Sequence, residues 1–498
     1  MSQIRETSQD PFKACKILVF SSEKPAGIPA LLIRAAVLIL LVTTLSLVFF
    51  AFSGQTRLFS CPQCGRSPVD SELSCETLAG DFAPTNISHI LFGIGGSVNT
   101  WPDRRRYSEL WWRPDTTRGF VWLDGDPGPN LSRSDNTPPY RVSEDWSGFK
   151  YSSSRSSVRI ARIVLESFRL GLPDVRWFVM GDDDTVFFTE NLVSVLAKYD
   201  HREMYYVGGS SESVEQDVMH SYGMAFGGGG FAISYPLAAR LAMVLDGCID
   251  RYYKFYGSDQ RVWACMSEIG VPLTRERGFH QIDIRGDPYG FLAAHPVAPL
   301  VSLHHLDYVW PLFPNQTQLE SVSRLVHAYR VDPPRIVQQS FCYDRRHNWT
   351  VSVSWGYTAQ IYPSLVTAID LERPLQTFQT WRSWDSGPFL FNTRPVKADP
   401  CEQPVVYLLE RVVEAGKKGG KSLSSYKRVG VGKECGRAEH AHALAVNRVV
   451  VSAEKMDPEF WKKAPRRQCC EMMERGMKSS ALRVRIRGCK SWETITAP

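Results

Sequence analysis

The sequence lacks three features that would point to common classes of protein. It has no dense basic stripe: the formal net charge is only +6 over 498 residues, which is not typical of a nucleic-acid-binding protein. It shows no clear internal repeat and, apart from the basic stretch 417–421, no strong low-complexity tract. With 43% hydrophobic residues the chain can bury a sizeable core. Its length indicates roughly two to four domains, or one large domain with additions.

A single long apolar run lies near the start of the chain, and no second one follows it. Residues 35–53 are 19 uncharged, mostly apolar residues, within the roughly 17–25 that a membrane-spanning helix requires. Cationic side chains precede the run and carboxylates follow it: Lys13, Lys16, Lys24 and Arg34, then Asp70, Glu72 and Glu76. The positive-inside rule therefore predicts a cytosolic tail (1–34), a signal anchor (35–53) and a lumenal remainder, as in a single-pass type II membrane protein. The alternative is a signal peptide cleaved near residues 51–53. The apolar run is, however, longer than the ~7–15-residue hydrophobic region of a typical signal peptide.

The glycosylation sequons and the cysteines fit a lumenal compartment. Sequons of the form Asn-x-Ser/Thr lie beyond the anchor at Asn86, Asn130, Asn315 and Asn348. Of the 12 cysteines only Cys15 precedes the anchor, and the other eleven favour disulfides in an oxidising lumen. Because eleven is odd, at least one thiol stays free or pairs between chains. Cys61 and Cys64 have zinc-site spacing, but only Cys75 is near as a third ligand, so a disulfide or free thiol is the preferred interpretation.

Strand and helix patterns alternate from residue 85 onward, after a polar stretch at 54–84 that is typical of a stem. Strands are predicted at 89–96, 119–123, 177–181 and 205–209, helices at 107–112, 159–170 and 190–198, and a loop at 126–139. This alternation indicates an α/β sandwich with a largely parallel central sheet. Ligands of such sheets bind outside the carboxyl ends of the strands, which is where Gly95, Gly96, Asp124 and residues 182–184 fall.

Three adjacent carboxylates, Asp182, Asp183 and Asp184, follow an apolar run that is long enough for one buried strand. Adjacent anions repel each other, so a hard divalent cation with oxygen ligands is their natural partner. Such a cation can neutralise a diphosphate leaving group, which indicates a nucleotide-sugar site. One alternative is an N-cap or calcium-stabilised turn. Another is the nucleophile loop of a haloacid-dehalogenase-like phosphatase, but the sequence offers no convincing later Lys and acidic pair.

A glycine-rich stretch at 226–231 contains Gly228, Gly229 and Gly230 immediately before Phe231. Glycines allow a ligand to approach the backbone closely, and the flanking aromatic rings can pack or stack on a sugar. The alternative interpretation is an ordinary glycine loop.

Two further motifs supply a candidate base and a candidate metal ligand. Asp259 follows a Gly-Ser turn, and an inverting sugar transfer needs one general base to deprotonate the acceptor hydroxyl; an N-cap is the alternative. His304 and His305 cannot face the same way on a strand, so one of them is the candidate ligand of a transition metal. A buried structural histidine is the alternative there.

Together these elements resemble the Fringe-like glycosyltransferases of glycosyltransferase family 31, and most closely a plant Fringe-related group. The resemblance covers residues 85–315 and rests on the order and spacing of four motifs: Asp-Asp-Asp at 182–184, the glycine loop at 227–231, Asp259, and Ser-x-His at 302–304. It implies a GT-A fold, a Mn²⁺ cofactor, a UDP-sugar donor and inversion at the anomeric carbon, commonly with a β-1,3 linkage. It also implies a Golgi membrane enzyme with a type II anchor, in agreement with the predicted topology.

The resemblance assigns roles to the candidate residues. Asp184 would ligate Mn²⁺, Asp182 and Asp183 would contact metal, ribose or bound water, and His304 (or His305) would complete the coordination. The residues expected to bind the donor substrate are Gly95, Gly96, Arg104, Arg105, Asp124, Asp182, Asp183, Gly228, Gly229, Gly230 and Phe231. For the arginine run at 104–106, a solvated surface is the alternative interpretation.

The sequence departs from the family in ways that leave the donor sugar and the acceptor open. Fringe proteins have Asn where Thr185 follows the triple Asp, and Gly-Gly-Ala-Gly-Phe where this chain has four glycines before Phe231. Residues 316–498 are not part of animal Fringe, and the strand-like runs and six cysteines in 340–498 predict a β-rich, disulfide-tied accessory module. The sequence thus predicts a metal-dependent inverting transferase that moves a hexose or N-acetylhexosamine to a glycan or glycoprotein acceptor. A non-catalytic glycan-binding or scaffold protein is the alternative.

Overall fold

The computed structural model describes residues 40–46, 83–128, 135–152, 154–382, 387–416, 419–430, 435–473 and 480–496. The chain divides into two compact units, Met1–Gly80 and Asp81–Pro498. In the first unit, residues 40–46 are helical. Among the described residues, no helix is both long and apolar enough to span a bilayer. The rest of the predicted anchor (35–53), the predicted tail (1–34), most of the stem, and Cys15, Cys61, Cys64, Cys75 and Asn130 lie outside the described residues.

The second unit contains a seven-stranded sheet with the strand order β3-β2-β1-β4-β7-β6-β8. Its strands are β1 (Ile90–Gly95), β2 (Arg118–Leu123), β3 (Tyr140–Val142), β4 (Trp177–Asp182), β6 (Tyr206–Gly208), β7 (Phe231–Ser234) and β8 (Leu273–Arg275). Only the two pairings of β7, with β4 and with β6, are antiparallel. Strands β1 and β4 are apolar runs buried on both faces, as parallel strands between helices must be. The predicted α/β fold with a largely parallel sheet is therefore confirmed.

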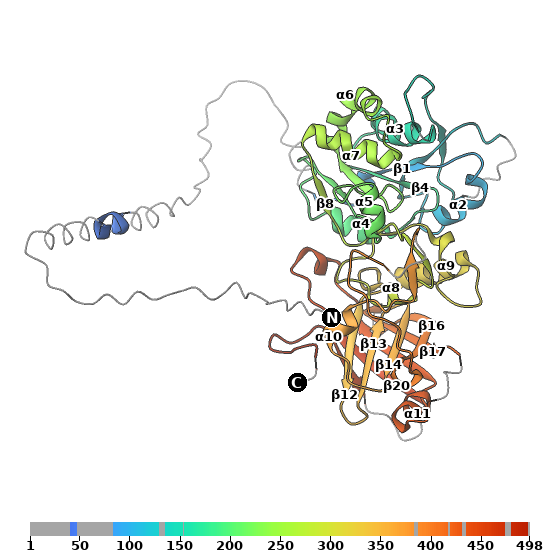
Figure 1. The fold of residues 1–498 in the computed structure, drawn as a ribbon, viewed down its shortest axis with the longest axis vertical. Helices are drawn as coiled ribbons and strands as arrows, with labels where there is room; N and C mark the ends of the chain where they lie inside the picture. The colour runs from blue at the N-terminus through green and yellow to red at the C-terminus, as the bar shows by residue number, and fades with distance from the viewer. Residues whose placement is uncertain are drawn as a thin grey trace, which may run out of the picture. The chain divides into compact units, whose positions relative to one another are not determined.

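Helices cover both faces of this sheet (Figure 1). On one face α3 (Ser156–Arg169), α6 (Tyr235–Arg251) and α7 (Ser258–Ile269) bury a cluster of apolar side chains against the strands. A disulfide between Cys248 and Cys265 joins α6 to α7. On the other face lie α2 (Trp101–Glu109) and α4 (Thr189–Leu196). The predicted helix at 107–112 was wrong in its bounds: α2 begins at Trp101, because Pro102 fits the first turn of a helix, where its missing N–H has no role.

Two small sheets bring distant segments to the carboxyl end of β4. Strand β11 (Ser302–Leu303) lies between β5 (Val186–Phe187) and β9 (Phe279–His280). The residues after β11 therefore lie beside the turn that follows β4. Strand β10 (Ile284–Gly286) pairs with β15 (Phe378–Thr380), which comes from much later in the chain.

The C-terminal region forms a closed barrel with the strand order β12-β13-β14-β16-β17-β18-β20-β19. Its strands are β12 (Gln339–Asp344), β13 (Trp349–Ser354), β14 (Thr358–Tyr362), β16 (Val405–Ala415), β17 (Lys421–Arg428), β18 (Arg448–Glu454), β19 (Cys469–Met473) and β20 (Ala481–Arg487). Along β20, Leu482, Val484 and Ile486 are buried while their neighbours face outward, the period-two pattern of a half-buried strand. Disulfides link Cys342 to Cys470, Cys401 to Cys435 and Cys469 to Cys489, which confirms the predicted disulfides of this region.

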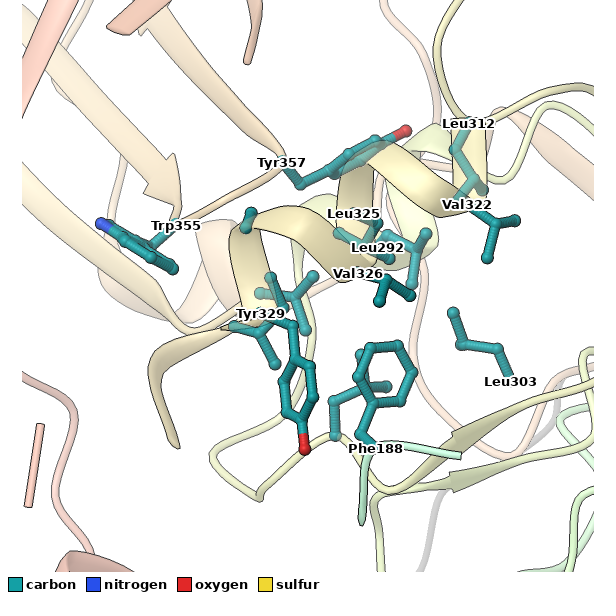
Figure 2. Packing of buried hydrophobic residues seen from close by; sticks show 14 of the residues in the cluster. Phe188, Leu292, Leu303, Leu312, Val322, Leu325, Val326, Tyr329, Trp355 and Tyr357 are labelled. Carbon is teal, nitrogen blue, oxygen red and sulfur yellow. The ribbon is translucent and has the colours of Figure 1, made fainter. Parts of the chain in front are cut away.

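Helices α8 (Tyr289–Ala293) and α9 (Gln318–Val331) lie between the seven-stranded sheet and the barrel (Figure 1). Figure 2 shows Val326 and Tyr329 of α9 packed between Phe188 on one side and Trp355 on the other. The rings of Tyr329 and Phe188 meet edge to face at 5.0 Å, and the hydroxyl of Tyr329 accepts a hydrogen bond from the backbone of Glu190 at 2.8 Å. One continuous apolar core therefore runs from the α/β region into the barrel. The division at 315/316 into a catalytic and an accessory domain stays a prediction.

Candidate functional site

Asp182, Asp184 and His304 form a group of side chains that can hold a metal ion. Their ligand atoms lie within 4.8 Å of one another. Nε2 of His304 lies 3.1 Å from Oδ1 of Asp184 and 3.7 Å from Oδ2 of Asp182. Oδ1 of Asp184 is buried and faces the His304 ring nitrogen, an arrangement in which a cation can replace the proton between the two groups. Two carboxylates and an imidazole fit Mn²⁺, Mg²⁺ or another divalent metal with oxygen and nitrogen ligands.

The charges of this group depend strongly on one another. Burial opposes the charge on His304, but Asp184 and Asp182 raise the pKa of its imidazole to about 9. Burial and the adjacent carboxylates raise the pKa of Asp182 to about 7, against the opposing effect of His304. Asp184 keeps a pKa well below its usual range in spite of burial, because His304 and Arg104 stabilise its charge. A bound cation would take the place of the proton that His304 carries at neutral pH and of the proton that Asp182 carries below about pH 7.

Arg104 on α2 connects the first helix to the triple Asp. Nη1 of Arg104 lies 3.1 Å from Oδ1 of Asp183 and 3.3 Å from Oδ2 of Asp184. The hydroxyl of Thr100 also donates to Oδ2 of Asp183 at 2.8 Å. Asp183 is thus held by Arg104 on α2 and by Thr100 just before it, and it lies outside the metal-capable group. Arg105, the other predicted arginine, is half-buried on the same helix.

His305 points to a different partner than His304 does. Its Nδ1 lies 3.0 Å from Oδ1 of Asp283, and its ring stacks on Trp381 at 4.4 Å with an interplanar angle of 6°. Trp381 also lies 4.9 Å from the guanidinium of Arg285, measured to the ring centroid. Of the two histidines that the sequence could not separate, the metal-capable group contains only His304.

Thr185, which follows the triple Asp, ties this turn to the glycine loop. Its hydroxyl donates to the carbonyl of Gly228 at 2.7 Å and accepts the N–H of Asp182 at 2.8 Å. The indole of Trp111 donates to the Thr185 carbonyl at 3.0 Å. Sequence reasoning missed this role and treated Thr185 only as a departure from Asn. No local pattern identifies it, because its partner lies 43 residues away.

The glycine loop passes directly under the ring of His304. A Cβ at Gly228 would lie 2.0 Å from Cε1 of His304, so only glycine fits there. The N–H of Gly229 donates to Oε1 of Gln281 at 2.5 Å, and Gly230 has a φ of +85°, which favours glycine. Phe231 is buried at the start of β7, where its ring meets Tyr206 edge to face. Phe231 therefore packs in the core of the sheet, and the prediction that it contacts a sugar stays untested.

Asp259 lies in the first turn of α7 and faces the glycine loop. Its Oδ2 accepts the N–H of Gly227 at 3.2 Å, and burial raises the pKa of its carboxyl above the ordinary value. A cavity of about 140 Å³ is lined by Asp259 together with Asp182 and His304. The candidate base and two members of the metal-capable group therefore face the same space.

The predicted residues at the ends of β1 and β2 shape the neighbouring turns. A Cβ at Gly95 would lie 3.4 Å from Oδ1 of Asp182, and one at Gly96 would lie 3.4 Å from Oδ2 of Asp183. A methyl group at either position would touch the nearby carboxylate at the edge of ordinary van der Waals contact, and at Gly96 it would press on Val121, 3.0 Å away. Asp124 accepts the hydroxyl of Ser97 at 2.9 Å and the N–H of Val98 at 2.8 Å, so it fixes the turn after β1 and lies outside the metal-capable group.

Residues 216–470 match the model of a family described as "Protein of unknown function, DUF604". Because this match spans just over half of the 498 residues, the chain belongs to the DUF604 family. The matched range includes the glycine loop, Asp259 and His304 and continues into the barrel. No curated protein matches the chain.

Among solved structures, the chain is similar to the catalytic domain of Drosophila β1,4-galactosyltransferase 7 in complex with xylobiose. The two share 10% identity over 38% of this chain and 64% of that one, with a TM-score of 0.23. The chain thus spans under two thirds of that structure, and a likeness this distant carries no argument about function.

Proposed function

We propose that this chain is a Mn²⁺-dependent inverting glycosyltransferase. It would move a hexose or N-acetylhexosamine from a UDP-sugar to a hydroxyl of a glycan or glycoprotein acceptor, with the β-1,3 linkage that the Fringe resemblance implies. The observation that carries this proposal is the shared cavity: Asp182 and His304 of the metal-capable group face the same space as Asp259. A transferase of this kind needs both a cation for the leaving diphosphate and a base for the acceptor.

Each side chain has a role that follows from its position. Asp182, Asp184 and His304 would hold the cation, which supplies positive charge to the diphosphate of the leaving UDP. Arg104 keeps Asp183 and Asp184 in place. Asp259 would take the proton of the acceptor hydroxyl, whose oxygen then attacks the anomeric carbon on the face opposite UDP. Its raised pKa makes its carboxylate a stronger base than an exposed aspartate, and general-base catalysis typically contributes ~10²–10⁴ in rate.

The same proposal includes the cellular location. The apolar run 35–53 with its charge asymmetry supports a signal anchor, and the disulfides in the described part of the chain support an oxidising compartment. We therefore include in the proposal a single-pass type II protein of the Golgi membrane whose catalytic region is lumenal.

The test is to incubate the purified full chain with a panel of UDP-sugars and Mn²⁺ and to measure UDP release with and without a chelator. We expect chelator-sensitive release from one donor. Asp184→Ala and Asp259→Ala should each abolish transfer while the protein stays folded. Asp115→Ala is the matched control, since Asp115 is exposed on the segment between α2 and β2. Folded protein that binds neither UDP nor Mn²⁺ and releases no UDP from any donor would favour the non-catalytic scaffold.

A further inference from the structure

Two further cavities lie where the α/β region meets the barrel region, apart from the Asp259 cavity. One has a volume of about 510 Å³ and the other about 500 Å³. They adjoin at the end of β8, where Arg275, Glu276 and Arg277 line both. We call the two together the junction groove. Each volume falls within the ~300–1,000 Å³ of typical small-ligand sites, so the groove has room for more than one sugar ring.

The junction groove shares no lining residue with the Asp259 cavity. The two are nevertheless close in the chain: His280 lines the groove, while the next residue, Gln281, lines the Asp259 cavity and binds Gly229. Residues from α10 (Ala368–Glu372) to the start of β19 complete the wall on the barrel side. The C-terminal region therefore builds one side of the groove.

Cations outnumber carboxylates around this groove. The cationic lining residues are Lys198, Arg275, Arg277, Arg373, Arg467, Lys462 and Lys463, and the acidic ones are Glu212, Glu276 and Glu372. The carboxylates are already engaged. Glu276 pairs with Lys198, Glu372 pairs with Arg467, and Glu212 is buried against His280, where burial raises the pKa of its carboxyl to about 8.

Two of the cations have no partner among the residues that the structure describes. Arg277 and Lys463 are exposed and make no hydrogen bond or ion pair with any residue that the structure describes. Arg467, whose side chain is only 7% exposed, has a buried Nε with no hydrogen-bond partner in the described chain. Arg277 and Lys463 therefore place positive charge at a concave surface, where a polyanion gains more than on a flat one.

Apolar side chains line the same groove between the charges. Leu390 and the half-buried Phe391 line the larger cavity together with Pro374, and the buried rings of Phe279 and Phe291 lie behind them. Apolar and aromatic surfaces pack against the C–H faces of sugar rings, whereas an inorganic anion makes no favourable contact with such surfaces. Arginine forks match planar carboxylates in two parallel hydrogen bonds.

From these features we propose that the junction groove binds an acidic glycan chain, with carboxylates on its sugar rings, as an accessory subsite for the acceptor. This inference rests on the proposed function, because it gives the acceptor of that transferase a chemical class: a uronate-containing glycan. It also gives the C-terminal region a role in substrate recognition.

The test uses the purified full chain and three probes: an oligogalacturonate, a neutral galactan oligosaccharide of equal length, and poly-glutamate as a polyanion without sugar rings. Binding is measured by calorimetry at low and at raised salt. We expect the oligogalacturonate to bind tightest, the other two to bind about tenfold more weakly or worse, and salt to weaken the binding because the attraction is electrostatic.

Charge-reversal variants locate the binding. The double variant Arg277→Glu, Lys463→Glu should weaken oligogalacturonate binding by about tenfold or more and leave UDP release from the donor alone unchanged. Arg345→Glu is the matched control, an exposed arginine between β12 and β13 that also makes no hydrogen bond or ion pair with a described residue. Equal binding of the neutral oligosaccharide or of poly-glutamate would overturn the proposal, as would unchanged binding in the double variant. Loss of chelator-sensitive UDP release is a separate readout that bears on the proposed function alone.

Discussion

Replacing Gly228 by alanine adds a single methyl group under His304. The new Cβ would lie 2.0 Å from Cε1 of the His304 ring and 2.4 Å from both ring nitrogens. Non-bonded carbon atoms rest about 3.5–4.0 Å apart, so the ring has to move by about 1.5–2 Å. Metal–ligand distances tolerate only about ±0.2 Å. His304 can then no longer complete the coordination, and we expect metal affinity to fall by about 10–100-fold or more.

The assay is a calorimetric titration of the full chain with Mn²⁺, alongside chelator-sensitive UDP release. Gly227→Ala is the matched control from the same loop, since a Cβ there meets its nearest atom, Cβ of Asp259, at an ordinary 3.5 Å. The control should keep its metal affinity, and thermal unfolding should show both variants folded. A Gly228→Ala variant with wild-type Mn²⁺ affinity would refute the assignment of His304 as a ligand.

Three further perturbations test other parts of the structure. Thr185→Val removes the hydroxyl that bonds the Gly228 carbonyl and the Asp182 N–H, and it should lower the free energy of unfolding in urea by about 1–3 kcal/mol. Thr185→Ser keeps the hydroxyl and should not lower it. Equal losses in the two variants would contradict the hydrogen-bond argument. Without metal, His304 titrates with a pKa of about 9 and Asp182 with a pKa of about 7. Metal binding below pH 9 therefore releases the His304 proton, and below pH 7 it releases the Asp182 proton as well. The apparent Mn²⁺ affinity should therefore rise with pH, by up to about tenfold per pH unit for each proton that metal binding releases. A pH-independent affinity in calorimetry would contradict these protonation states. Removing the Cys248–Cys265 disulfide, which closes a loop of sequence separation 17, by a double change to alanine should lower the free energy of unfolding by about 3 kcal/mol; an unchanged unfolding midpoint would show that the crosslink does not constrain the unfolded chain.

The parts of the site that the sequence predicted are those with a local signal. An apolar run that ends in three carboxylates marks a strand end, and this placed Asp182 and Asp184 correctly at the end of β4 and in the turn after it. The α/β alternation was visible for the same reason, since helical and strand periodicity are properties of short windows.

The contacts that the sequence could not predict join residues far apart in the chain. Thr185 bonds to the glycine loop, and His305 contacts Asp283 and Trp381, so no window around His305 reveals which histidine joins the metal-capable group. The closure of the barrel was equally hidden, because β12 pairs with β19 across more than a hundred residues and their order is set by packing rather than by propensity. The strand-like runs within 340–498 were nevertheless recognisable, and the structure has β13, β16, β18 and β20 among the strands of that region.

The pairing of β10 with β15 has a consequence for how the protein is made. All the candidate site residues have been synthesised once His305 has been translated, yet β10 gains its partner only after residues 378–380 have followed. Trp381, which stacks on His305, arrives at the same moment. The nascent chain therefore carries every candidate catalytic group before β10 and His305 gain these contacts. A chain that ended before residue 378 would keep the triple Asp and both histidines, but it would lack the pairing of β10 with β15 and the ring that stacks on His305.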